Sequence, residues 1–154
     1  MADRREVPLF QLPVPEGPPR GTRDAWQRRD MLVALLHPGC DICHALHRQL
    51  MARAPGWRQE ELEVFCVVPP GRPGEPLPPG ALQDSEGRVS RELAHALGAS
   101  PGAAVLAVAN RFGLLYAALD IHGGPTEAVL HEALEWVDLA QRQCGECFAP
   151  LDWD

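Results

Sequence analysis

The sequence predicts an α/β fold in which a mixed central sheet carries helices on both faces. Three observations support this prediction. Short apolar runs of six to eight residues are typical of buried strands. In other, mostly longer segments, apolar residues recur every three or four positions, as on one face of a helix. These segments follow one another as strand, helix, strand, loop, helix, strand, strand and helix, an order that fits a single layered domain.

Composition excludes several classes of protein. The chain has 154 residues, and its 14 basic and 21 acidic residues give a net charge of −7. No basic surplus exists to displace counterions from phosphates, so we expect no nucleic-acid partner. Every basic residue is Arg, which excludes Schiff-base chemistry on Lys. No apolar run approaches the roughly 20 residues of a membrane span. The start, MADRREVPLF, lacks the apolar core of a secretory signal, so we expect a cytoplasmic protein without a membrane partner.

Each element follows from its local pattern. Residues 1–30 are expected to form an extended, Pro-rich lead-in, with a helical turn around 23–29. Residues 31–142 form the predicted domain, and residues 143–154 a tail. Strands are predicted at 31–36, 62–68, 103–109 and 114–121, and helices at 41–53, 89–97 and 126–143. The loop at 69–80 has six prolines and three glycines in twelve residues, too many for regular structure.

Four of the five cysteines form two C-x-x-C pairs, Cys40/Cys43 and Cys144/Cys147. The fifth, Cys66, lies in the middle of a predicted strand and is expected to be a small buried apolar residue. In a reducing compartment, cysteines are more often catalytic or metal-binding than structural. The two pairs are therefore the most informative feature of the sequence.

The first pair lies where a buried strand gives way to a helix, in the segment MLVALLHPGCDICHALHRQL. Free backbone N–H groups and the helix dipole stabilise a thiolate at such a helix start. Cys40 is expected at or near the N-cap, with Cys43 one turn inside and more sheltered. An accessible attacking thiol beside a resolving thiol is the arrangement that thiol–disulfide exchange needs. His37 and His44 are candidates to support this chemistry, whereas Asp41 would oppose a thiolate.

The strand and helix order, with a C-x-x-C opening the first helix, resembles the thioredoxin fold. The lead-in VPLFQLP, the junction HPGCDIC and the later NRFG turn resemble the redoxin branch, which shares features with peroxiredoxins. The resemblance extends from about residue 7 to residue 139. It implies that Cys40 is the nucleophile and Cys43 the resolving cysteine. The family's cis-proline opens the third strand, a position that falls near Ala104 here, and the nearest proline is Pro101, a further candidate for support.

The function implied is that of a thiol–disulfide oxidoreductase with no organic cofactor or metal. Its partners would be protein or small-molecule disulfides and a thiol electron donor. Thiol peroxidase activity is a weaker alternative. Peroxiredoxins place Thr or Ser three residues before the peroxidatic cysteine, and here Cys40 occupies that position relative to Cys43. They also carry an Arg near the third strand, and residues 100–108 contain none.

Other interpretations of the cysteines stay open. The string from Cys40 to His44 also matches the C-x-x-C-H pattern of covalent haem attachment, and the pair could bind a metal or be inert. Cys144 and Cys147 could form a local dithiol, bind a metal together with a partner chain, or have no role. The last predicted helix is about 27 Å long and should separate this tail pair from the first pair. A non-catalytic thioredoxin-fold module with a metal- or partner-binding tail is therefore the main alternative.

The histidines divide into two groups by their expected position. His47, His95 and His131 fall on predicted helix surfaces and are expected to be solvated. His37 and His122 each follow a strand that ends at the edge where the first cysteine pair is expected. Histidine titrates in the physiological range, so either of these two could take part in the chemistry.

Overall fold

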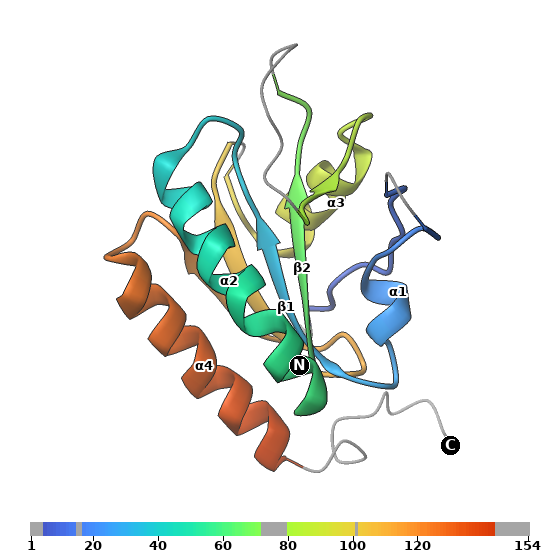
Figure 1. The fold of residues 1–154 in the computed structure, drawn as a ribbon, viewed down its shortest axis with the longest axis vertical. Helices are drawn as coiled ribbons and strands as arrows, with labels where there is room; N and C mark the ends of the chain where they lie inside the picture. The colour runs from blue at the N-terminus through green and yellow to red at the C-terminus, as the bar shows by residue number, and fades with distance from the viewer. Residues whose placement is uncertain (1–4, 15–16, 72–79, 101, 144–154) are drawn as a thin grey trace.

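The computed structural model of this protein describes residues 5–14, 17–71, 80–100 and 102–143. It confirms the predicted α/β class, because a mixed five-stranded sheet is covered by helices on both faces (Figure 1). The strands, in the order β3-β2-β1-β4-β5, are β1 (Asp30–Leu35), β2 (Leu62–Val68), β3 (Leu82–Gln83), β4 (Val105–Ala109) and β5 (Leu115–Asp120). The helices are α1 (Thr22–Ala25), α2 (Asp41–Gln59), α3 (Arg88–Ala96) and α4 (Thr126–Arg142).

Strand directions determine which loops meet. β1 pairs in parallel with β2 and antiparallel with β4, and β4 pairs antiparallel with β5. β5 therefore runs parallel to β1, and both strands end at the same edge of the sheet. The loops that follow them, residues 36–40 and 121–125, come together at that edge. We call this edge, which includes the start of α2, the dithiol edge.

The core has one layer on each face of the sheet. β1, β2 and β4 are buried along their whole length, which confirms that the continuous apolar run at 31–36 belongs to a strand covered on both faces. α2 and α4 cover one face, where Leu46, Leu50 and Leu130 are at most 2% exposed. α3 and the lead-in cover the other face, which takes up Val7 and Leu93. Each such side chain contributes roughly 1.5–3 kcal/mol by its burial.

Two elements differ from the prediction. The sheet has a fifth strand, because Leu82–Gln83 pairs in parallel with the end of β2. Two residues are too few to show the period of a strand, so the sequence alone could not identify it. α2 also runs to Gln59, six residues beyond the predicted end, and passes through Pro55. Trp57 explains the extension, since it continues the face of α2 that packs on the core.

The position of His47 also contradicts the prediction, because its side chain is 2% exposed rather than solvated. The buried residues of α2 are Cys43, Leu46, His47 and Leu50, a run at helical spacing. Ile42, an apolar residue at helical spacing with Leu46, is instead 40% exposed. The buried face of α2 is therefore centred about one residue further along the chain than the apolar residues alone indicate. This orientation places Cys43 in the core.

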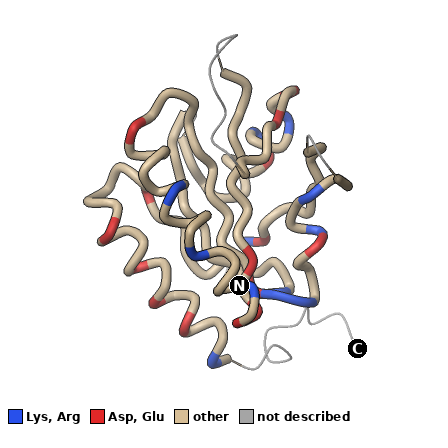
Figure 2. The backbone as a smooth tube through the Cα atoms, in the orientation of Figure 1, with Lys and Arg blue, Asp and Glu red and all other residues tan. Residues whose placement is uncertain are grey.

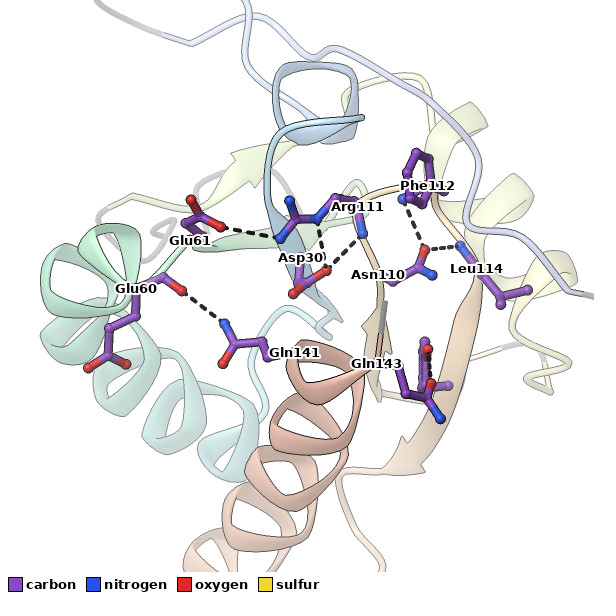
Figure 3. A network of polar contacts seen from close by, with 10 residues as sticks. Asp30, Glu60, Glu61, Asn110, Arg111, Phe112, Leu114, Gln141 and Gln143 are labelled. Atoms are coloured by element: carbon purple, nitrogen blue, oxygen red, sulfur yellow. Dashed lines mark hydrogen bonds and ion pairs between the residues drawn. The ribbon is translucent and has the colours of Figure 1, made fainter. Parts of the chain in front are cut away.

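Polar contacts join the elements at the edge opposite the dithiol edge (Figure 3). The Arg111 backbone N–H donates to Asp30 Oδ1 at 2.9 Å, and its guanidinium pairs with Glu61 at 3.2 Å. Burial raises the pKa of Asp30, although the charge of Arg111 opposes that rise. Gln141 Nε2, near the end of α4, donates to the carbonyl of Glu60 just beyond α2, at 2.9 Å. α4 therefore ends at the edge far from the start of α2, as its predicted length required.

No helix in the described residues is both long and apolar enough to cross a membrane.

Candidate active site

Cys40 is the N-cap of α2, as the sequence predicted. Its backbone is extended, with φ −100° and ψ 116°, and its Sγ accepts a hydrogen bond from the backbone N–H of Cys43 at 3.2 Å. Gly39, just before it, has φ 71°, a left-handed conformation that Gly adopts without steric cost. The turn presents a half-buried sulfur to one of the free N–H groups of the helix start, where a negative charge is stabilised.

Cys43 lies one turn further along and is only 1% exposed. Its Sγ accepts a hydrogen bond from the backbone N–H of His37 at 3.4 Å. Burial, and secondly the hydrogen bond with Cys40, raise the pKa of Cys43 to about 12. Both cysteines are free thiols in this structure. The pair therefore combines a sulfur that a substrate can reach with one that stays protonated and sheltered.

His122 lies beside the pair, with its Nε2 3.7 Å from Cys40 Sγ. The turn after β5 holds it there, because the His122 backbone N–H donates to Asp120 Oδ1 at 2.9 Å and Gly123 N–H to the Asp120 carbonyl. The sequence had placed His122 at this edge without assigning it a role. The sequence does not give the distance of His122 from Cys40, because that distance depends on β1 and β5 ending at the same edge of the sheet.

The other predicted support residues have different outcomes. His37 lies beside the pair, but its contact with Cys43 comes from its backbone, and its buried Nε2 has no hydrogen-bond partner among the described groups. The described contacts of His44 include no hydrogen bond from its side chain to either sulfur. Pro101, Cys144 and Cys147 lie outside the described residues.

Cys66 is buried in the middle of β2 at 1% exposure, as predicted. Burial raises the pKa of this thiol to about 12. It takes no part in the arrangement around Cys40.

A cavity of about 640 Å³ opens beside His37, between α3 and the loops after β1 and β2. Its walls include Pro70, Ala94 and Ala103, together with the imidazole of His37. Ser90 is 8% exposed, and its Oγ, like His37 Nε2, has no hydrogen-bond partner among the described groups. The cavity is therefore largely apolar and lies next to the cysteine pair, with Glu86, Arg91 and His95 also on its walls.

The charges lie mostly away from this edge. Acidic residues recur along the exposed side of α4, at Glu127, Glu132, Glu135 and Asp138 (Figure 2). The loops 36–40 and 121–125 contain no Asp, Glu or Arg, and the charge nearest in sequence to Cys40 is Asp41. The charged residues nearest to the pair are therefore the exposed Asp41 and, on the walls of the cavity beside His37, Glu86 and Arg91.

Three potential metal ligands meet at the dithiol edge. The Sγ atoms of Cys40 and Cys43 and a ring nitrogen of His122 all lie within 4.8 Å of one another. Their burial increases from the exposed His122, through the half-buried Cys40, to the buried Cys43.

Solved structures with the same architecture identify the fold. No protein-family model and no curated protein sequence matches the chain. A protein from Neisseria meningitidis, provisionally described as a thioredoxin, superposes with TM-score 0.66 at 17% identity, over 94% of this chain and 95% of that one. The thioredoxin domain of a thiol-disulfide oxidoreductase from Bacteroides vulgatus gives TM-score 0.64 at 11% identity, over 89% and 99%. Peroxidoxin BcpB from Mycobacterium tuberculosis gives 0.62 at 14% identity, over 88% and 96%.

The chain therefore has a thioredoxin-like fold with a C-x-x-C dithiol at the start of the helix after β1. The structures similar to it include both thioredoxin-like and peroxiredoxin-like proteins. The resemblance to the thioredoxin fold, inferred from the sequence, is confirmed.

Proposed function

We propose that this protein is a thiol–disulfide oxidoreductase in which Cys40 is the nucleophile and Cys43 the resolving cysteine. The observation that carries the proposal is the difference in access between two sulfurs three residues apart. Cys40 is half-buried and Cys43 is 1% exposed, so a substrate reaches Cys40 first. The named activities of similar structures agree with this chemistry.

The reaction proceeds in two exchanges. The Cys40 thiolate attacks one sulfur of a substrate disulfide, forming a mixed disulfide and releasing the other sulfur as a thiolate that takes up a proton. Cys43 then loses its proton and attacks Cys40 Sγ. This second step closes the Cys40–Cys43 disulfide and releases the second substrate thiol. The substrate gains two electrons and two protons, and the dithiol loses them to become a disulfide.

The backbone supports both steps. The N–H of Cys43 already donates to Cys40 Sγ, so negative charge on that sulfur needs little rearrangement. The N–H of His37 donates to Cys43 Sγ, where charge develops as this cysteine attacks. Burial holds Cys43 as a thiol until the mixed disulfide forms, which keeps the two thiols from acting at once.

The substrate class is a disulfide in a protein or a small molecule, and a separate thiol returns the pair to its reduced form. The cavity beside His37 would hold an apolar group next to the scissile bond, with Glu86 and Arg91 as the charged residues on its walls. The cytoplasmic location expected from the sequence belongs to this proposal and stays a prediction. Fractionation of cells producing the full chain would test it.

The test is an assay of insulin reduction with dithiothreitol as donor. Cys40→Ser should abolish the activity, because no nucleophile remains. Cys43→Ser should accumulate a mixed disulfide, because the resolving thiol is lost, and mass spectrometry would detect the adduct on Cys40. Normal turnover by Cys43→Ser would contradict the two-cysteine mechanism.

Two further variants separate the proposal from its alternatives. Cys66→Ala serves as the matched control, because it removes a buried thiol that makes no described hydrogen bond with Cys40 or Cys43, and it should keep full activity. Cys144→Ser combined with Cys147→Ser should also remain active. If this double variant lost activity while Cys40→Ser kept it, the tail pair would be the reactive site. Peroxide consumption in the same preparations would reveal a thiol peroxidase.

A further inference from the structure

The three side chains at the dithiol edge have the composition of a metal site. Two thiolates and one imidazole form a soft donor set that suits Zn²⁺, which is bound in proteins by Cys and His. Cys40 and Cys43 come from the start of α2, and His122 comes from the turn after β5, 82 residues after Cys40 in the sequence. Neither C-x-x-C spacing nor any neighbouring sequence indicates this third ligand.

The spacing of the ligand atoms agrees with one tetrahedral ion. With Zn–S bonds of about 2.3 Å and Zn–N bonds of about 2.0–2.1 Å, tetrahedral angles separate S from N by about 3.6 Å and S from S by about 3.8 Å. The observed separation of Cys40 Sγ and His122 Nε2 is 3.7 Å. All three ligand atoms lie within 4.8 Å of one another, so small side-chain rotations would bring the set to bonding geometry.

The surroundings hold the ligands but leave one position open. The turn at Asp120 holds the backbone of His122, and the helix start holds both cysteines. No fourth Cys, His, Asp or Glu joins the group in the described part of the chain. Since His122 is exposed and Cys43 is buried, the fourth position of an ion would face solvent. Two Cys, one His and a water molecule make a known type of zinc site.

We propose that the reduced protein binds one Zn²⁺ through Cys40, Cys43 and His122, with a water molecule as fourth ligand. Binding replaces the protons of the two thiols, so two protons leave as one Zn²⁺ enters and the site becomes electrically neutral. The metal and the disulfide exclude one another, because zinc binds the two sulfurs as thiolates, whereas in the disulfide they are bonded to each other. A zinc-bound thiolate is also unavailable as a nucleophile. Zinc would therefore mask the dithiol, and a chelator would restore it.

This inference is independent of which disulfide the protein reduces. Zinc affinity is measured without any turnover, and turnover is measured in the presence of a chelator. If the protein bound no zinc but reduced disulfides normally, the zinc site would be contradicted and the proposed function would stand. If the protein bound zinc but reduced no disulfide, the proposed function would be contradicted and the zinc site would stand.

The test uses full-length reduced protein in which Cys144→Ser and Cys147→Ser remove the tail thiols. Zn²⁺ is titrated against a chromogenic chelator, and the expected stoichiometry is one ion per chain. His122→Ala should weaken the affinity by about tenfold or more, since loss of even an outer-shell partner costs 10–100-fold. His44→Ala is the matched control, because it removes a histidine from the same helix turn without removing a ligand, and its affinity should be unchanged.

Cobalt substitution supplies a readout that misfolding alone would not imitate. Co²⁺ in the background protein should give an intense tetrahedral d–d spectrum with a thiolate charge-transfer band, and His122→Ala should change it while circular dichroism stays the same. Prior oxidation of Cys40 and Cys43 should abolish binding. The proposal is overturned if the background protein binds no zinc, or if His122→Ala and His44→Ala bind it equally tightly. Binding that requires the tail cysteines would also overturn it.

Discussion

The buried thiol of Cys66 should make the folded protein sensitive to alkaline pH. Burial raises the pKa of this thiol from an ordinary value of 9.0 to about 12. In the unfolded chain the thiol meets water and titrates near its ordinary value. Between these two values, the folded state holds a proton that the unfolded state has released. The free energy of unfolding must therefore fall as pH rises through this window.

The size of the effect follows from the two pKa values. Stability is fully present below pH 9 and decreases by up to about 1.4 kcal/mol for each pH unit above it. Between pH 8 and pH 10.5, Cys66 alone should lower the free energy of unfolding by about 2 kcal/mol. This is a large share of the 5–15 kcal/mol that stabilises a typical domain.

The assay is urea unfolding of the reduced protein at both pH values, for the natural chain and for Cys66→Ala. The natural chain should lose about 2 kcal/mol more than the variant between pH 8 and 10.5. Cys66→Ala creates a small cavity that lowers the free energy of unfolding equally at both pH values. This cost cancels when the change between pH 8 and 10.5 is compared for the two proteins. The comparison also removes the contributions of other titrating groups, because both proteins share them. Equal losses in the two proteins would refute the argument that burial keeps this thiol protonated.

Three other predictions concern the site and its support. In the reduced protein at pH 8, iodoacetamide should label Cys40 well before Cys43, because burial and the raised pKa protect Cys43; peptide mapping that found equal labelling would contradict this. Asp84→Ala should cost about 1–2 kcal/mol in urea unfolding, because the buried Asp84 carboxylate accepts the Ser90 N–H in the first turn of α3 at 2.7 Å. Leu130→Ala should cost about 2–5 kcal/mol, since this side chain of α4 is 2% exposed in the core; a thermal midpoint close to that of the natural chain would show that α4 packs elsewhere.

Local patterns identified most of the elements. The strand at 31–36 was predictable as a continuous run of apolar residues, and the strand at 62–68, which contains Glu63, from its β-branched and aromatic residues. The N-cap position of Cys40 was also predictable, since it follows from where the strand ends and the helix pattern begins. β3 was not predictable, because two residues show no periodicity. α2 continues through Pro55, because Trp57 beyond it packs on the core.

The error at His47 has a specific cause. Ile42 and Leu46 form one apolar face at helical spacing, but the buried face consists of Cys43, Leu46, His47 and Leu50. α2 has two overlapping faces that could pack inward, and its packing against the sheet decides between them. The resulting orientation decides the chemistry, because it buries Cys43 and leaves Cys40 within reach.

The sequence by itself therefore determined the α/β class, the order of the elements and a cysteine pair at a helix start. These properties depend on residues that are neighbours along the chain. Only the tertiary structure decided that His122 lies 3.7 Å from Cys40 Sγ, and that Ser90 and His37 face one cavity. Such distances depend on the strand order β2-β1-β4-β5, which places the ends of β1 and β5 at one edge. Residues far apart in sequence meet there because the sheet packs as a whole, and no local pattern records that meeting.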